Sequence, residues 1–173
     1  GKLPDNYIDP PNISYSFEFE ESENLIVSTN ALARLNRGNF KWNKNESFTI
    51  TNPDKEIQYQ GHFDKMFDNN INYLIEQTKI AYESMKYKDV LKYAFYEMIN
   101  SKDEYILFNG DDYTKLNPTL MVHFLRTFFI IINPIIPHWS EYMYRTYLNP
   151  LFTKFNMNEL CITFLAKATF PTI

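Results

Sequence analysis

The chain has 173 residues, of which 45% are hydrophobic and 17% aromatic, so it can build a sizeable core and wholesale disorder is not expected. Its 4 glycines do not have the spacing of loops that bind nucleotide phosphates. One cysteine excludes an internal disulfide, and 3 histidines argue against structural zinc. No apolar run reaches the roughly 18 residues of a membrane span. We therefore expect no metal, no cofactor bound by this chain and no membrane insertion.

The formal net charge is −4, whereas nucleic-acid-binding domains are usually basic. Any RNA contact must therefore come from a local basic patch, or from a larger protein to which the chain belongs.

The first 60 residues are predicted to be mostly irregular. Prolines and alternating aromatics indicate an extended arm over residues 1–21, which either contains a short strand or packs against a neighbouring domain. Leucine spacing predicts a short helix over residues 22–37. Residues 38–60 are polar and contain Gly38 and Pro53, which is typical of a long loop.

The strongest helical signal begins at residue 62. Apolar residues then recur three and four positions apart, as on one face of a long helix: Phe63, Phe67, Ile71, Leu74, Thr78, Ala81 and Met85. A second helix is predicted over about residues 87–107, with its apolar face formed by Leu91, Ala94 or Phe95, Met98, and Tyr105 or Ile106. A short link at residues 86–89 would make the two helices an antiparallel hairpin.

Two further helices are predicted after a turn at residues 109–112. Asn117 is a favourable N-cap and Pro118 a favourable first helical residue, so a third helix begins there and ends at Asn133-Pro134. A fourth helix runs from Pro137 to Asn149-Pro150.

These elements predict an all-α fold, an antiparallel bundle of about four to five helices with an extended N-terminal arm. The expected organisation is an arm at 1–21, a bundle at 22–150 and a C-terminal tail at 151–173 that packs on the bundle.

No arrangement of residues indicates a catalytic site. Nucleophile elbows, His-Glu-x-x-His and Cys-x-x-Cys motifs do not occur. Adjacent acidic pairs such as Asp103-Glu104 do not face each other on a helix, so solvation or helix capping explains them better than acid–base chemistry. His138 follows Pro137 and is predicted to be structural, with its ring bonded to nearby backbone. His62 and His123 have no partner near them in the sequence.

Basic residues gather around the predicted hairpin link. Tyrosines lie between them, and this mixture can hold phosphates while aromatic rings pack on sugars or bases. The competing interpretation is a solvated face balanced by Glu76, Glu83 and Asp89. The cluster consists of Lys79, Lys86, Lys88 and Lys92.

Several segments resemble one known family. The runs FDNNINYLIEQT at 67–78, YESMKYKDVLKY at 82–93, Phe95-Tyr96 and Asp103-Glu104-Tyr105 are similar to the helical anticodon-binding domain of cytosolic, eukaryotic or archaeal-type, leucyl-tRNA synthetase. The run NPIIPHWSEYMYR at 133–145 resembles a Pro-x-x-Pro-His block shared by several class I synthetases. Weaker similarity extends to NALARL at 30–35 and Phe170-Pro171.

The resemblance implies a tRNA-binding role inside a larger enzyme. The parent would be a class I aminoacyl-tRNA synthetase that activates leucine with ATP and transfers it to tRNA. The bundle would then support the tRNA along its inner, stem side, and leucine enzymes of this family generally depend less on the anticodon bases than their relatives do. The lysine cluster, with Arg126 and Arg145 as outlying members, would contact tRNA phosphates. We expect a cytoplasmic location, and the mitochondrial matrix stays open for a divergent paralogue.

The chain also departs from that family. The catalytic signatures His-x-Gly-His and Lys-Met-Ser-Lys-Ser do not occur, since Phe67 follows Lys65-Met66. The chain therefore cannot aminoacylate tRNA alone. Two hypotheses follow: a tRNA-binding piece of a leucyl-tRNA synthetase, or a stand-alone non-catalytic paralogue that is a subunit of a larger protein assembly. In the second, exposed aromatics such as Tyr15, Phe17 and Phe19 would anchor the protein interface.

Overall fold

A computed structural model describes residues 50–112, 115–168 and 170–171. The predicted arm at 1–21, the helix at 22–37 and most of the loop at 38–60 lie outside these residues. Within them the chain is helical and contains no strand, which confirms the prediction of an all-α bundle. No helix in this part of the chain combines the length and the apolar character needed to cross a membrane.

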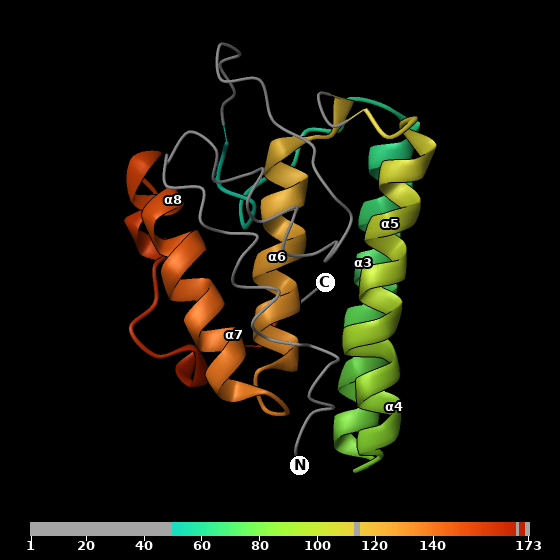
Figure 1. Ribbon diagram of the computed structural model, residues 1–173, viewed down its shortest axis with the longest axis vertical. Helices are drawn as coiled ribbons and strands as arrows, with labels where there is room; N and C mark the ends of the chain where they lie inside the picture. The colour runs from blue at the N-terminus through green and yellow to red at the C-terminus, as the bar shows by residue number, and fades with distance from the viewer. Residues whose placement is uncertain (1–49, 113–114, 169, 172–173) are drawn as a thin grey trace.

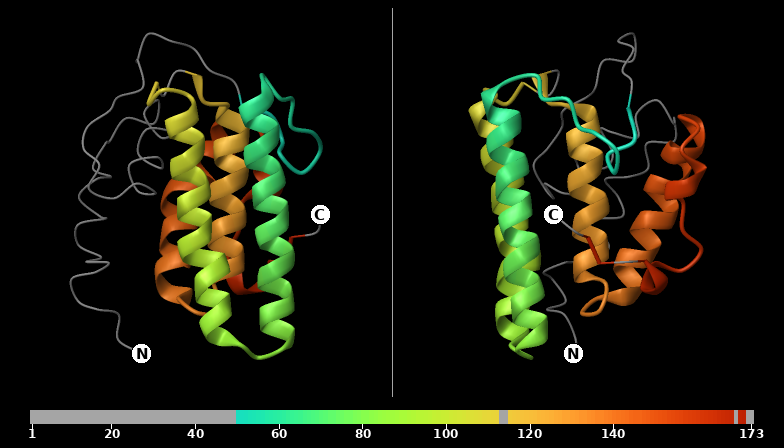
Figure 2. Two further views of the ribbon diagram at one scale, coloured as in Figure 1. Left: turned by 90° about the vertical axis from the view of Figure 1, so that its right-hand side faces the viewer. Right: turned by 180° about the vertical axis from the view of Figure 1, so that it is seen from behind.

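The helices form three layers (Figure 1). The hairpin made by α3 and the α4–α5 segment is one outer layer, α6 is the middle layer, and α7 with α8 is the other outer layer. The two views in Figure 2 show α6 behind the hairpin and then between the two outer layers.

The first helix of the hairpin, α3 (His62–Glu83), buries the predicted face. Five of the seven predicted positions are buried: Phe67, Ile71, Leu74, Thr78 and Ala81. Phe63 and Met85, at the two ends of the predicted stripe, are exposed. The buried face is therefore shorter than predicted: Phe63 is exposed in the first turn of α3, and Met85 lies beyond the last residue of the helix.

The second arm of the hairpin is continuous but irregular. It consists of α4 (Tyr87–Leu91), the π-helical turn η2 (Lys92–Glu97) and α5 (Met98–Phe108). Ala94, Met98, Tyr105 and Ile106 face the core as predicted, and all are buried. The arm ends in a Schellman motif, in which Gly110 takes a φ of 71° and the Asp111 amide donates to the Ile106 carbonyl at 3.0 Å.

Helix α6 (Pro118–Ile132) is buried on almost every side. As predicted, Asn117 caps it: the side-chain oxygen accepts hydrogen bonds from the amides of Thr119 at 3.1 Å and Leu120 at 3.3 Å. Burial all round is expected for a helix between two layers. On its far side the Phe128 and Phe129 rings pack edge-on against the Trp139 ring of α7.

The last layer contains α7 (Pro137–Met143), the π-helical turn η4 (Tyr144–Leu148) and α8 (Asn149–Lys154). The prediction that Asn149-Pro150 ends this helix is wrong. Pro150 has no N–H for the Thr146 carbonyl, and the wider turn at η4 comes just before it, which lets the helix continue past the proline. Beyond α8, the short 3-10 turns η5 (Asn158–Leu160) and η6 (Leu165–Lys167) bury Leu160 and Leu165.

The segment at residues 50–61 crosses from α6 to the start of α3 (Figure 2). Its start is held by the Thr51 amide, which donates to the Thr119 hydroxyl at 3.0 Å. Its end is held by the Tyr59 hydroxyl, which donates to Asp68 of α3 at 2.5 Å. This hydrogen bond, with desolvation, raises the pKa of Tyr59 to about 12, so the phenol stays protonated at neutral pH.

Candidate nucleic-acid interface

The lysine cluster lies at the end of the hairpin where α3 meets α4. A Schellman motif closes α3: Met85 takes a φ of 58°, its amide donates to the Tyr82 carbonyl at 3.0 Å, and the Lys86 amide donates to the Ala81 carbonyl at 2.9 Å. The link is therefore residues 84–86, not 86–89 as predicted, because the chain re-enters a helix immediately at Tyr87. This tight reversal fixes Lys86 and Lys88 at the tip.

All four lysines of the cluster, Lys79, Lys86, Lys88 and Lys92, are exposed. None of them forms an ion pair with any residue that the structure describes, Glu76, Glu83 and Asp89 included. The interpretation of a face neutralised by pairing therefore receives no support from contacts. Among the described residues, no carboxylate pairs with these cationic groups.

Aromatic rings accompany these cations. Tyr87 and Tyr96 are exposed on the same arm of the hairpin, and the Lys92 ammonium group lies 5.0 Å from the centre of the Tyr93 ring. Ammonium groups attract phosphates, while phenol rings pack on sugars and bases. Chemically, the hairpin tip can hold a polyanion with exposed aromatic or sugar surfaces, as RNA has.

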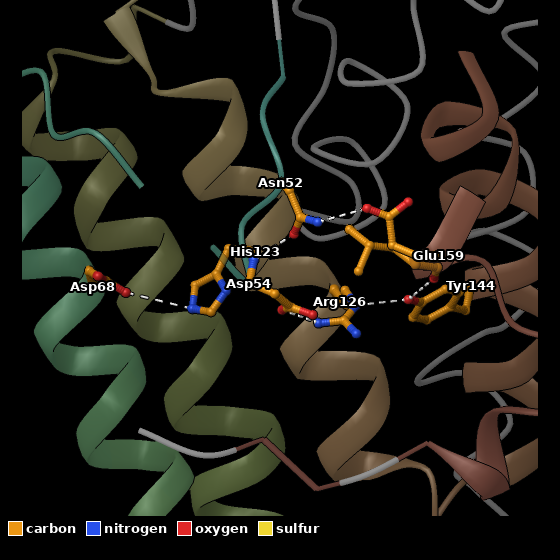
Figure 3. Close-up of polar contacts among 8 residues, drawn as sticks. Asn52, Asp54, Asp68, His123, Arg126, Tyr144 and Glu159 are labelled. Carbon is orange, nitrogen blue, oxygen red and sulfur yellow. Dashed lines mark hydrogen bonds and ion pairs between the residues drawn. The ribbon is translucent and has the colours of Figure 1, made fainter. Parts of the chain in front are cut away.

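Arg126 differs from the lysines because its guanidinium group is already engaged (Figure 3). Its Nη1 lies 2.6 Å from Asp54 Oδ1, and its Nε donates to the Tyr144 hydroxyl at 2.9 Å. The Tyr144 hydroxyl donates in turn to the Leu160 carbonyl at 2.8 Å. This chain of contacts ties the 50–61 segment, α6 and the C-terminal turns together. Arg126 therefore stabilises the packing of these segments, a role that the sequence alone does not predict.

Arg145, the other outlying residue, lies on η4 in the opposite outer layer and is exposed. It lines a groove beside α7 together with His138. The structure thus brings the lysines together at the hairpin tip and leaves Arg126 and Arg145 apart from them. Binding of RNA by any of the six residues stays a prediction.

The histidines are placed differently from one another. His138 is exposed, and its ring forms no hydrogen bond with any described residue. The predicted bonding of this ring to nearby backbone is therefore not observed among these residues. His123 has an acidic partner, with its Nε2 atom 3.6 Å from Asp68 Oδ1 (Figure 3). Desolvation lowers the pKa of His123 despite Asp68 and Asp54, and Arg126 adds to the lowering. Within the described ranges, no three His, Cys, Asp or Glu side chains converge as a metal site.

A buried polar cluster at the other end of the hairpin had no signal in the sequence. Asp64 accepts hydrogen bonds from the Tyr105 hydroxyl at 2.5 Å, the Gln60 amide at 2.7 Å and the Asn117 side-chain amide at 3.0 Å. The Tyr105 hydroxyl also accepts from the Asn117 backbone amide at 2.9 Å. Desolvation, followed by the bond to Asp64, raises the pKa of Tyr105. The cluster joins the starts of α3 and α6 to the end of α5.

A family model for the anticodon-binding domain of tRNA ligase matches residues 64–171, more than half of the chain. The chain belongs to the anticodon-binding domain family of tRNA ligases. The matched region begins at the start of the hairpin and includes the lysine cluster, so the tip described above is part of an anticodon-binding domain.

Curated relatives narrow the similarity to leucine enzymes. Over 82 residues the chain is 33% identical to "Leucine--tRNA ligase, cytoplasmic" of Neurospora crassa, covering 47% of the chain and 7% of that protein. It is 34% identical over 85 residues to "Putative leucine--tRNA ligase, cytoplasmic" of Schizosaccharomyces pombe, covering 49% of the chain and 8% of that protein. It is 33% identical over 86 residues to "Leucine--tRNA ligase, cytoplasmic" of Saccharomyces cerevisiae, covering 50% of the chain and 8% of that protein.

The aligned part is therefore less than a tenth of these relatives' length. No solved structure matches the chain.

Proposed function

We propose that this anticodon-binding domain binds tRNA(Leu) and supports its aminoacylation as part of a larger, cytoplasmic leucyl-tRNA synthetase. Family membership supports tRNA binding, and the names of the curated relatives support leucine and the cytoplasm. Leucine activation with ATP would take place in another part of the parent enzyme. The domain contributes contact with the tRNA rather than chemistry.

The observation that carries this proposal is the set of exposed lysines at the hairpin tip, which pair with no acid among the described residues. Lys86 and Lys88 are held there by the Schellman motif, and neither pairs with an acid among the described residues. Each lysine that neutralises a phosphate releases condensed counterions, so binding must weaken as salt rises. These contacts position the RNA without reading its sequence.

The direct test is charge reversal in the variant Lys86→Glu/Lys88→Glu. We expect the Kd for a tRNA(Leu) transcript at about 100 mM salt to rise roughly tenfold, and the slope of log K against log salt to decrease by about two, one per lost phosphate contact. Fluorescence anisotropy over a salt series measures both. The affinity for a tRNA that accepts another amino acid should fall by the same factor in this variant.

The matched control is Lys55→Glu/Lys65→Glu, which makes the same charge change at exposed positions near the start of α3. This control should keep nearly full affinity. Equal losses in the two variants would mean that only net charge matters, and salt-insensitive binding would contradict phosphate contact altogether.

The second hypothesis, a non-catalytic subunit of a protein assembly, is favoured by one feature. At the end of the hairpin opposite the lysines, Phe63, Leu107 and Phe108 are exposed, and the two phenylalanine rings stack with centroids 5.4 Å apart. Exposed apolar clusters of this kind mark protein contacts. Intact mass of the native protein separates the hypotheses: a polypeptide of 20.7 kDa in a stable complex supports the subunit, and a chain several times longer supports the synthetase.

A further inference from the structure

A groove lies between the α7–η4 segment and the chain that leads into η6. Its volume is about 770 Å³, within the range of small-molecule sites. The residues that matter for its chemistry are His138, Tyr142 and Arg145 on one wall and Phe164 on the other. The family match assigns no role to this groove.

The second wall is held in place by hydrogen bonds. Glu141 of α7 accepts from the Leu165 amide, with oxygen–nitrogen distances of 2.6 and 3.3 Å. The Asn149 side chain donates to the Ile162 carbonyl at 2.9 Å and accepts from the Ile162 amide at 3.0 Å. The groove is therefore preformed. Its acidic residue, Glu141, is held in place by the backbone N–H of Leu165.

The lining of the groove includes two exposed aromatic rings, Tyr142 and Phe164, and the guanidinium group of Arg145. Tyr142 is 51% exposed and Phe164 is 53% exposed, so both rings can be reached from solvent. The Lys167 ammonium group lies 5.6 Å from the centre of the Phe164 ring, and Arg145 makes no ion pair with any described residue. Exposed rings next to cationic groups are how proteins hold unpaired nucleotides, by stacking the base and neutralising its phosphate.

We propose that this groove binds an unpaired nucleotide of RNA, with the base stacked on Tyr142 and Phe164 and the adjoining phosphate at Arg145. The inference rests on the proposed RNA-binding function and adds a second contact site in a different layer. Figure 1 supports a common ligand, because the α6–α7 connection and the hairpin tip lie at the same end of the molecule. RNA backbone held by Lys86 and Lys88 can then continue toward α7.

The test compares single-stranded with double-stranded RNA on the full chain. Labelled ten-nucleotide oligouridine and a blunt RNA duplex are titrated against Tyr142→Ala and Phe164→Ala, with Tyr73→Ala as the control for loss of an exposed ring (58% exposed, on α3). Each groove variant should weaken oligouridine binding at least fivefold, since stacking is worth about 1–3 kcal/mol per base. Duplex binding should change less than twofold, and the control should change neither.

Unchanged oligouridine binding in both groove variants would overturn the inference. The proposed function would survive that result if Lys86→Glu/Lys88→Glu still weakened both RNAs, whereas absence of any RNA binding would overturn both. Crosslinking of the unmodified protein with 4-thiouridine RNA removes dependence on the variants' folding. Crosslinks in the peptides containing Tyr142 or Phe164 support the inference, and crosslinks confined to the hairpin contradict it.

Discussion

Replacing Tyr105 by phenylalanine removes one oxygen atom from the buried cluster that joins three helices. That oxygen donates to Asp64 at 2.5 Å and accepts from the Asn117 amide at 2.9 Å, and the tyrosine side chain is almost fully buried. The stacking of the ring on Phe67, with centroids 4.4 Å apart, would be retained. The change therefore isolates two hydrogen bonds without creating a large cavity.

The expected loss in free energy of unfolding follows from those two hydrogen bonds. A hydrogen bond to a carboxylate contributes about 1.5–3 kcal/mol, and a buried amide left without an acceptor costs about 1–3 kcal/mol. Asp64 keeps the Gln60 and Asn117 donors, which lowers the sum. We expect Tyr105→Phe to reduce the free energy of unfolding by about 3 kcal/mol, a large fraction of a domain's stability.

Urea unfolding followed by circular dichroism measures this loss. Tyr73→Phe is the control, because Tyr73 lies exposed on α3 and its hydroxyl makes no hydrogen bond to a described residue. Tyr82→Phe loses a single hydrogen bond, which the Tyr82 hydroxyl donates to the Ile131 carbonyl at 2.6 Å. Its loss in free energy of unfolding should be about 1 kcal/mol, between those of the other two variants. If Tyr105→Phe were as stable as Tyr73→Phe, the cluster would not hold the helices together and the reasoning would fail.

Two further predictions concern the contacts around α6. The lowered pKa of His123 means that the folded state binds this proton less well than the unfolded state, so stability is intact above about pH 6.5 and decreases as pH falls below it. When the pH is lowered from 7.5 to 5.5, the free energy of unfolding measured in urea should decrease by about 1 kcal/mol less for His123→Gln than for the unmodified chain. Equal decreases in the two proteins would rule out the histidine as the cause. Arg126→Met should reduce the free energy of unfolding by about 1–2 kcal/mol, because Tyr144 and Asp54 each lose a partner. Faster hydrogen exchange in the 50–61 segment would confirm that Arg126 anchors it, and unchanged exchange would contradict this.

Local features of the sequence predicted local structure well. The Asn117-Pro118 cap depends only on residues within one helical turn, and the α3 face depends on a period that any long helix must follow. The end of the last helix was mispredicted at Pro150 because a single proline does not determine whether the preceding turn can widen to accommodate it.

Contacts between distant residues could not be predicted in this way. The sequence predicts Arg126 as an outlying member of the lysine cluster, yet its partner Asp54 is 72 positions away, and Tyr105 bonds to Asp64 across 41 positions. Which acid meets which base depends on how three layers stack, and neither periodicity nor composition encodes that. The lysine cluster was easier to locate, because its members lie close together in sequence around one link.

The net charge of −4 therefore describes the field at the hairpin tip poorly. Asp64 and Asp68 accept hydrogen bonds near the start of α3, and about 22 Å of helix separates Asp68 from Glu83 at 1.5 Å per residue. That is about two Debye lengths at 0.1 M salt, so those acids scarcely affect a phosphate at the tip.

Among the described residues closer to the tip, the four lysines outnumber Glu76, Glu83 and Asp89 by only one charge. So small an excess should give steeply salt-dependent but modest affinity for tRNA when the domain acts alone. A domain of this kind is suited to orienting a tRNA that other parts of a larger enzyme also hold. An isolated chain with nanomolar affinity at physiological salt would be inconsistent with this electrostatic arrangement.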